Sequence, residues 1–267
     1  MPLHAINARE WGPRLRFCAP PRIVERFYRE FESQCQSGSD VAPFTLYGSG
    51  DFHYLSALWL RRFSEPLVLI SFDNHPDWVI TPPKWACGGW INRALELPHV
   101  QHVAIWGCGN FECWWPHNIF ANRTAQRDGR LEVHPWVDDR PMKDRERPGA
   151  ILRENWREQF KKWVSDLPSA NVYVTIDLDC LRADDAATNW ENGRFTVDDV
   201  EWALGRLHED TRILGGDVCG AYSKPSYARW KQEFAANWDH PRIVPPSADQ
   251  VRATFSALER LWPALAH

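Results

Sequence analysis

Two acid-rich segments stand directly at the ends of apolar runs, and they limit how this chain can fold. Segment 73–77 (Asp-Asn-His-Pro-Asp) follows the run 67–72, and segment 177–179 (Asp-Leu-Asp) follows the run 172–176. Short apolar runs rich in β-branched and aromatic residues are typical of buried strands. Four carboxylates that such strands bring together repel one another, and an unpaired buried charge is expensive. The two segments therefore predict two strand ends that meet around neutralising cations.

The rest of the chain alternates apolar runs with amphipathic stretches, which is typical of βαβ units around a buried parallel sheet. The predicted strands are 44–47, 67–72, 100–106, 131–134, 172–176 and 212–214, and the predicted helices are 22–35, 51–63, 151–166, 197–208 and 248–261. We therefore expect an α/β fold with a mostly parallel sheet, in one domain over residues 1–267.

Local signals place two helix starts and two irregular segments. Thr196 with Asp199, and Ser247 with Gln250, have the spacing of capping boxes. Segment 137–149 is charged and contains prolines, so we expect a surface loop. Segment 223–246 combines prolines with aromatic residues and is predicted to be an ordered excursion.

Composition excludes several classes of protein. The net charge of -4 comes without a basic stripe, so we expect no nucleic-acid partner. No run of about 18 apolar residues occurs, so we expect no membrane span. Seven cysteines form no Cys-x-x-Cys pair, and residues 1–20 lack the apolar core of a secretory leader. Reduced thiols in the cytoplasm are therefore expected.

A third strand-like run precedes His53, so potential ligands stand near three strand ends. Functional groups gather beyond the carboxyl ends of parallel strands. If segment 73–77 stays extended, Asp73, His75 and Asp77 point to one side, as do Asp177 and Asp179. Oxygen-rich ligation with two imidazoles favours two divalent ions, with Mn(II) before Zn(II), Fe(II) or Co(II). An alternative interpretation treats the acids as Asx turns and helix caps, and His53 as an ordinary helix-start residue.

These residues resemble the arginase, agmatinase and formimidoylglutamase superfamily of ureohydrolases. Its shared segments are Gly-Gly-Asp-His, Asp-x-His-x-Asp and Asp-x-Asp, and the resemblance covers about residues 48–220. It implies a three-layer α/β/α fold, two manganese ions bridged by a hydroxide that attacks a guanidino or formimino carbon, and assembly of identical subunits into trimers or hexamers.

By position, the resemblance implies two overlapping sets of metal ligands. One ion would be held by His53, Asp73, Asp77 and Asp177, and the other by His75, Asp73, Asp177 and Asp179, so that Asp73 and Asp177 bridge. Segment 50–53 reads Gly-Asp-Phe-His, with one residue inserted between the acid and the histidine. Asp51 is therefore an outer candidate, which would orient a ligating imidazole or form an ordinary salt bridge or helix cap.

The chain departs from the family in the groups that recognise the substrate. The final acid and proline of Asp-x-Asp-x-x-Asp-Pro are absent after Asp179, segment 85–90 lacks the proton-shuttling histidine, and segment 216–220 lacks the glutamate that grips a guanidinium. Arginine is therefore not the expected substrate. The candidates for proton delivery are Cys87, Glu112 and Tyr222, in addition to Asp77. Each of these three also has an ordinary interpretation, as a buried thiol, a solvated acid and a packed phenol.

Aromatic and basic residues near the second motif could complete a pocket for a small molecule. Such a pocket could be lined by Trp78, Trp85 and Trp90, or these three side chains could pack in the core. Lys84 could bind a substrate carboxylate or lie on the surface with its stem over aromatic rings.

Three functions remain open from the sequence. The first is a hydrolase with two metal ions that acts on a guanidino, amidino or linear amide carbon-nitrogen bond. The second is a deacetylase-like amidohydrolase with one zinc ion, which Gly215 and Gly216 followed by Tyr222 would suit. The third is a metal-binding protein that has lost catalysis.

Overall fold

Six parallel strands form one sheet in the computed structural model, which describes residues 4–35 and 43–266. The strand order is β1-β6-β5-β2-β3-β4, and each neighbouring pair is parallel. The strands are β1 (Phe44–Leu46), β2 (Leu67–Phe72), β3 (Val100–Trp106), β4 (Leu131–His134), β5 (Asn171–Asp177) and β6 (Arg212–Cys219). The predicted domain 1–267 includes residues 1–3, 36–42 and 267, which lie outside the described residues.

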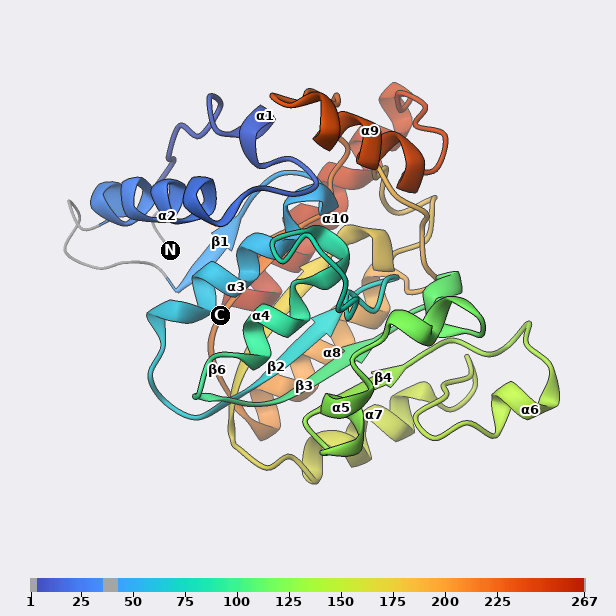
Figure 1. Ribbon diagram of the computed structural model, residues 1–267. Coiled ribbons are helices and arrows are strands. Elements are labelled where there is room, and N and C mark those ends of the chain that lie inside the picture. Colours follow the sequence, from blue (N-terminus) through green and yellow to red (C-terminus); the bar gives the residue numbers. More distant parts are fainter. Residues whose placement is uncertain (1–3, 36–42, 267) are drawn as a thin grey trace.

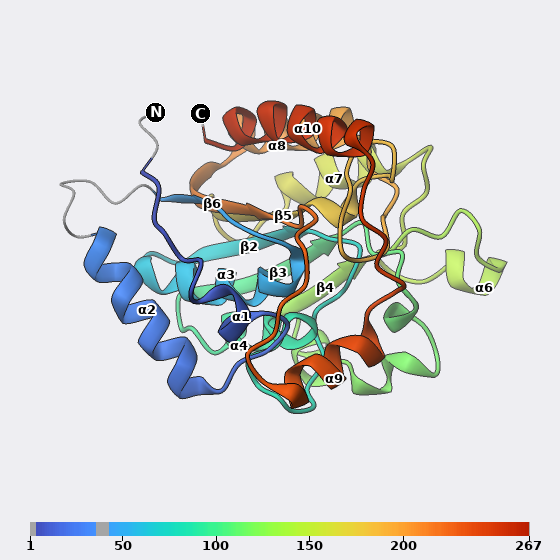
Figure 2. The same ribbon diagram turned by 90° about the horizontal axis from the view of Figure 1, so that it is seen from above.

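Helices cover both faces of this sheet (Figures 1 and 2). One face carries α7 (Trp156–Ser165), α8 (Val197–Asp210) and α10 (Ala248–Ala266), and the other carries α2 (Pro21–Cys35), α3 (Ser56–Trp59) and α4 (Ile91–Leu95). The remaining helices are α1 (Gly12–Leu15), α5 (Arg123–Arg127), α6 (Met142–Arg145) and α9 (Trp230–Asp239), and the short 3-10 turns are η1 (Gly50–Leu55), η2 (Leu60–Arg62), η3 (Cys87–Gly89), η4 (Phe111–Cys113), η5 (His117–Phe120) and η6 (Leu178–Cys180). The predicted three-layer α/β/α fold is confirmed.

The strands divide the apolar core into two layers because their side chains alternate. In β2, Leu67 and Leu69 pack into the layer under α3 and α4. Val68, Ile70 and Phe72 pack into the layer under α7, α8 and α10. Strands that are apolar on both sides can be buried on both faces, which is the usual environment of a parallel sheet. The continuous apolar runs in the sequence reflect this burial.

The predicted elements are mostly present, with four larger differences in their bounds, one of which is that α10 continues to Ala266, beyond the predicted end at 261. Strand β6 continues through Cys219, beyond the predicted end at 214. The predicted helix 51–63 is broken into η1, α3 and η2. The predicted helix 151–166 begins only at Trp156. Both capping boxes form: Thr196 with Asp199 before α8, and Ser247 with Gln250 before α10.

The two irregular segments each carry a helix. Segment 137–149 is a charged surface loop that includes α6, and segment 223–246 is the predicted ordered excursion. Its helix α9 has a weak apolar pattern, which the sequence analysis did not identify as a helix. This segment lies beyond the carboxyl ends of the strands (Figure 1).

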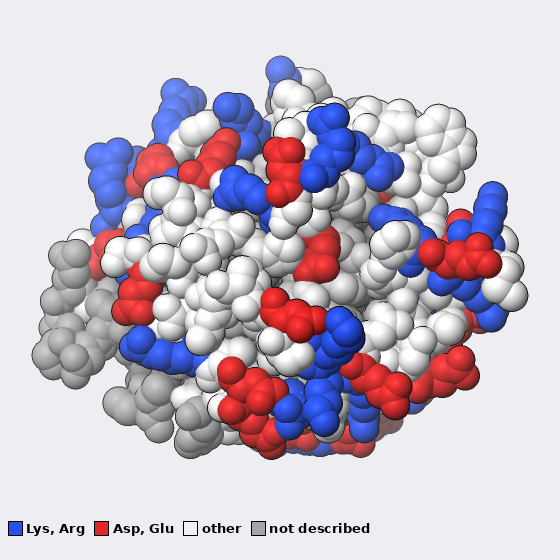
Figure 3. Space-filling model, turned by 90° about the horizontal axis from the view of Figure 1, so that it is seen from below, with Lys and Arg blue, Asp and Glu red and all other residues white. Residues whose placement is uncertain are grey.

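Charges are mixed on the face drawn in Figure 3. Lys and Arg side chains alternate there with Asp and Glu side chains, and no continuous basic surface covers this face. Among the described residues, no helix combines the length and the apolar character that crossing a bilayer requires.

The order of strands brings the acid-rich segments together. Strand β5 lies between β2 and β6, and Phe72 pairs with Ile176 while Asp177 pairs with Cys219. Directly after β6, Gly220 has a φ of 103°, and a Cβ there would lie 2.2 Å from Asp177 Oδ1. Glycine is therefore required at this position, because any larger residue would overlap the Asp177 side chain.

Replacing Gly220 with alanine should lower the free energy of unfolding by about 2 kcal/mol, because the new methyl group overlaps Asp177 and the backbone conformation disfavours a side chain. Urea denaturation measures this change. The matched control is Gly205→Ala at an exposed position of α8, where a Cβ meets nothing within 4 Å. That substitution should raise stability by about 0.5–1 kcal/mol. Equal effects of the two substitutions would contradict the assigned role of Gly220.

Candidate metal centre

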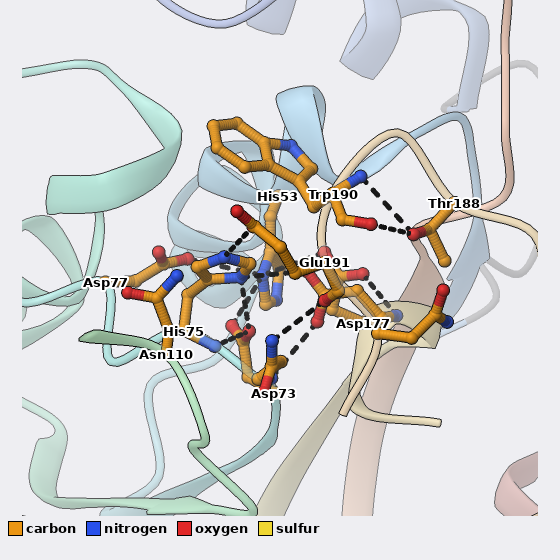
Figure 4. A network of polar contacts seen from close by, with 12 residues as sticks. His53, Asp73, His75, Asp77, Asn110, Asp177, Thr188, Trp190 and Glu191 are labelled. Carbon is orange, nitrogen blue, oxygen red and sulfur yellow. Dashed lines mark hydrogen bonds and ion pairs between the residues drawn. The ribbon is translucent and has the colours of Figure 1, made fainter. Parts of the chain in front are cut away.

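Six acidic and imidazole side chains converge where β2 and β5 end. His53 comes from η1, Asp73, His75 and Asp77 come from the turn after β2, and Asp177 and Asp179 come from the junction of β5 with η6. All six are buried, and His75 has the largest exposed fraction, at 9%. Figure 4 shows the labelled members of this cluster pointing toward one another. The structure thus brings together every residue that the sequence predicts as a metal ligand.

His53 faces three carboxylates through one nitrogen. Its Nδ1 lies 3.1 Å from Asp73 Oδ2, 3.4 Å from Asp77 Oδ2 and 3.5 Å from Asp177 Oδ2. This nitrogen is buried and has no hydrogen-bond partner in the part of the chain that the structure describes. A cation between these four side chains would satisfy the nitrogen and all three acids at once. They are the same residues that the family resemblance assigns to one ion.

His75 defines a second group that shares Asp73 with the first. Its Nδ1 lies 2.9 Å from Asp179 Oδ2 and 3.7 Å from Asp73 Oδ1. His53 with Asp73 and Asp77, and His75 with Asp73 and Asp179, are both close enough to hold a metal ion. A further close group joins His53 to Asp217 and Cys219. The chain therefore contains buried clusters of histidine and aspartate that could bind metal.

The acids reach the cluster through tight turns, and the expectation of an extended segment 73–77 is wrong. The backbone N–H of His75 donates to Asp73 Oδ1 at 2.7 Å, and that of Asp179 donates to Asp177 Oδ1 at 3.0 Å. Asp77 has a φ of 42°. The Asx turn and the helix cap of the alternative interpretation are thus present. The second oxygen of each carboxylate, Oδ2, nevertheless faces His53.

The cluster raises the pKa of three carboxylates. Burial, together with neighbouring acids, raises the pKa of Asp177 to about 8 and that of Asp77 and Asp179 to about 6. Burial opposes the charged form of His53 and His75, but the adjacent carboxylates outweigh it and raise the pKa of each imidazole well above its usual value. In the protein without cations, bound protons therefore balance the charge of the cluster.

A buried hydroxyl network fixes the orientation of His53. Thr175 Oγ1 donates its only proton to Asp217 Oδ1 at 2.7 Å, so it accepts at its 2.9 Å contact with His53 Nε2. Nε2 therefore carries a proton, so Nδ1 is the nitrogen whose lone pair becomes available to a cation once its own proton is displaced. Asp217 itself accepts from four hydroxyl groups, those of Tyr47, Ser56, Tyr173 and Thr175. Neither Thr175 nor Asp217 was identified from the sequence.

A pocket opens over the cluster and holds two of the predicted proton-transfer residues. Cys87 and Glu112 both line it, together with Asp73, His75 and Asp77. Burial raises the pKa of Glu112 to about 7 and raises that of the Cys87 thiol well above its usual value. Tyr222 lies in a different depression, beside His240 and Lys224. The structure therefore gives Tyr222 no place beside the cluster.

The other candidates near the site have structural contacts. Trp90 is fully buried and donates its Nε1–H to Asp77 Oδ2 at 2.6 Å, which orients that acid. Trp78 and Trp85 are also buried and do not line the pocket. Lys84 lines a separate depression with Ile80. Its predicted contact with a substrate carboxylate in this pocket therefore has no structural basis.

Asp51 does not contact a ligating imidazole. Its carboxylate pairs with Arg16 Nε at 2.7 Å and with His240 Nε2 at 2.5 Å. The expectation that Asp51 orients a metal-ligating histidine is therefore wrong, and its role is the buried salt bridge of the alternative interpretation. The bridge ties the excursion that carries α9 to η1 and so to the segment that contains His53.

Five side chains that line the pocket were not identified from the sequence, and Phe111 is one of them. Asn110, Trp190, Glu191 and Asp239 all line the pocket, and Glu191 Oε2 lies 3.4 Å from His75 Nε2. Figure 4 shows Asn110 beside Asp77 and His75, and Glu191 pointing toward His75. Asn110 and Glu191 follow β3 and β5, so the rule of strand carboxyl ends could have found them. Asp239 ends α9 and gave no such signal.

Manganese should stabilise the protein more at pH 8 than at pH 6. The folded pKa values of Asp77, Asp177 and Asp179 lie above the ordinary value, so the metal-free protein loses stability as pH rises through them. A cation must displace these protons, so its affinity rises with pH. Thermal unfolding at both pH values, with and without Mn²⁺, measures the increment in unfolding temperature that Mn²⁺ produces. An increment that is equal at both pH values, or unchanged in Asp177→Asn, would contradict this assignment.

Thr175→Val should weaken manganese binding by roughly 10- to 100-fold, because His53 Nε2 loses its acceptor and the ring its fixed orientation. Titration of metal-free protein with Mn²⁺ measures the affinity. The matched control is Ser71→Ala: Ser71 pairs with Thr175 across the sheet, and within residues 4–35 and 43–266 its buried hydroxyl has no hydrogen-bond partner. The control should bind manganese as the parent protein does. Parental affinity in Thr175→Val would exclude the tautomer assignment.

Comparisons with known protein sequences do not assign this chain to a family. No protein-family model matches this chain. Over 176 residues it is 29% identical to an uncharacterized protein of Thermotoga maritima, and this match covers 66% of this chain but only 57% of that protein, less than two thirds of its length.

Three solved structures have the same architecture at low sequence identity. An agmatine ureohydrolase of Thermoplasma volcanium has a TM-score of 0.53 at 16% identity, with 91% of this chain and 69% of that chain covered. An arginase from Bacillus cereus has a TM-score of 0.54 at 16% identity, with 91% of this chain and 77% of that chain covered. A formimidoylglutamase from Bacillus subtilis has a TM-score of 0.53 at 13% identity, with 89% of this chain and 67% of that chain covered. The chain therefore has the ureohydrolase fold that its three motifs predict.

Proposed function

We propose that this protein is a hydrolase that uses two divalent cations to cleave a non-peptide carbon-nitrogen bond in a guanidino, amidino or linear amide substrate. The observation that carries this proposal is the pair of ligand groups that share Asp73 at the floor of one pocket. Likeness of fold to an agmatine ureohydrolase, an arginase and a formimidoylglutamase supports the reaction class. Arginine remains an unexpected substrate. The cytoplasmic location and assembly of identical subunits remain predictions.

The donor set fits a pair of hard divalent cations. Among the described residues, neither His53 Nδ1 nor Asp73 Oδ2 has a hydrogen-bond partner, and the two buried atoms lie 3.1 Å apart, so both can turn toward one cation. Four carboxylates and two imidazoles without a thiolate in the ligand set favour Mn(II). When bound, such a pair lowers the pKa of a water molecule toward neutrality and polarises the carbon that is attacked.

Glu112 is our choice for proton transfer. It lines the pocket, and burial gives its carboxyl a pKa of about 7, which suits a group that both accepts and donates a proton near neutral pH. Glu112 would take a proton from the attacking water and return it to the leaving nitrogen. Cys87 is less suited, because its raised thiol pKa keeps it protonated at neutral pH.

The deacetylase-like alternative has little support from the geometry. It depended on Tyr222 to polarise an amide carbonyl, and Tyr222 lies outside the pocket. A metal-binding protein without catalysis would have the same ligand cluster, so only turnover distinguishes it from the hydrolase.

Protein loaded with manganese should contain about two ions per chain and hydrolyse a member of a panel of guanidino, amidino and acylated amine compounds. Glu112→Gln should lower kcat by roughly 10²- to 10⁴-fold while metal content stays parental, because the amide holds no transferable proton. Tyr222→Phe is the control and should keep parental kcat. Two bound ions without turnover of the whole panel would support the binding protein, and one bound ion would contradict the two-cation site.

A further inference from the structure

A second depression lies outside the pocket over the cluster. The described residues that line it all belong to the segment between β6 and α10, from Tyr222 to Pro245, and none of them lines that pocket. Its volume is about 510 Å³, which is within the usual range for sites that bind small molecules. We call it the Tyr222 depression. The excursion therefore forms a concave surface of its own, separate from the metal centre.

The permanently charged side chains in the Tyr222 depression are both basic. Lys224 and Arg242 line it, and no carboxylate of a described residue does, although the whole chain has a net charge of -4. In residues 4–35 and 43–266, no hydrogen bond, ion pair or ring contact involves Lys224 Nζ or the Arg242 guanidinium. Exposed cations are usually solvated, so these two alone would not define a site.

A buried imidazole in the same depression is an independent sign of a ligand. His240 lines the depression, and its side chain is only 3% exposed. Its Nε2 lies 2.5 Å from Asp51 Oδ1, but its Nδ1 is buried and has no hydrogen-bond partner in the described part of the chain. A buried polar atom without a partner is costly. This nitrogen therefore indicates that a polar group from outside the chain reaches the depression.

Further polar groups and an apolar wall complete the lining. The Tyr222 hydroxyl and the Asn237 amide line the depression, and neither has a hydrogen-bond partner among the described residues. Beside them lie Pro225, Pro241 and Ile243. Proline rings lose little side-chain freedom when a ligand packs on them. Cations and donors next to a rigid apolar wall are suited to an anion that also has a hydrocarbon part.

We propose that the Tyr222 depression binds a small organic anion, whose carboxylate or phosphate group pairs with Arg242 and Lys224 while its aliphatic part lies against the proline and isoleucine side chains. A guanidinium presents parallel N–H donors that match two oxygens of either group. Lysine adds a point charge, and the Tyr222 hydroxyl adds one more donor. An uncharged molecule of the same shape leaves both cations without a partner and binds more weakly.

His240 connects the Tyr222 depression to the metal centre. Its ring lies 4.3 Å from the ring of Trp190, which lines the pocket over the cluster. Its contact with Asp51 reaches η1, the turn that carries His53. An anion in the depression thus lies beside the residue that fastens the excursion to the sheet. Because the depression exists only in the folded chain, an anion that binds there should also raise the temperature of unfolding.

Calorimetry on the full chain loaded with manganese tests this site with butanoate, butyl phosphate and butan-1-ol. We expect at least one of the two anions to bind roughly 10-fold more tightly than the alcohol, because charge-assisted hydrogen bonds to Arg242 and Lys224 form only with an anion. The tighter of the two anions shows which headgroup the site takes. Inorganic phosphate should bind more weakly than butyl phosphate, since it makes no contact with the apolar wall.

Substitution of the two cations locates the binding. Arg242→Gln and Lys224→Gln should each weaken binding of the preferred anion by about 10-fold, since each removes a charged partner. The matched control is Lys231→Gln, because Lys231 is an exposed cation on α9 that lines neither the Tyr222 depression nor the pocket over the cluster. This variant changes the net charge by the same amount and should bind the anion as the parent protein does.

Anions also bind to exposed metal ions, so the titration is repeated on the chain without manganese, at a temperature below its thermal midpoint. The affinity for the preferred anion should be unchanged there. Binding that requires manganese, or that is retained in both Arg242→Gln and Lys224→Gln, would overturn the proposal. Equal affinity for both anions and the alcohol, or equal effects of Arg242→Gln and Lys231→Gln, would overturn it as well. Hydrolysis is not part of this test, so the proposed function can fail while the anion site stands.

Discussion

Repulsion among four buried carboxylates is the constraint on which this site depends. Asp73, Asp77, Asp177 and Asp179 meet at the end of the sheet with His53 and His75 between them. No arrangement of these groups is stable without positive charge, which protons supply in the metal-free protein and divalent cations can supply in the loaded protein. The pKa values of three of these acids are raised, because protonation relieves their repulsion. Charge at this point therefore links stability, pH and metal binding.

The sheet supplies the rigidity that holds such groups against repulsion. Strand β5 lies between β2 and β6, so its last residue stands beside both neighbours. Below the cluster, Asp217 on β6 holds Thr175 on β5, and Thr175 holds His53 on η1. The orientation of one imidazole is thus set by hydrogen bonds that cross two strands. Gly220 completes the arrangement, since a larger residue there would displace Asp177.

The pocket over the cluster is lined in part by segments that surround the sheet. Glu112 and Glu191 follow β3 and β5, but Asp239 arrives on the excursion that the salt bridge between Asp51 and His240 fastens to η1. The cluster lies at strand ends and the rest of the pocket lining on loops and one helix, so the lining can vary without disturbing the cluster.

The sequence by itself determined the order of strands and motifs along the chain, the parallel α/β fold and the six members of the cluster. Apolar runs and acids at their ends are local patterns, and local patterns can be read directly from the chain. It did not determine the turn at segment 73–77, the break of helix 51–63, or the places of Tyr222, Asp51 and Asp239. Those depend on contacts between residues far apart in the chain, such as His53 with Thr175 and Asp51 with His240. Only the tertiary structure fixes these contacts, because each is a balance of burial, charge and packing that no single segment contains.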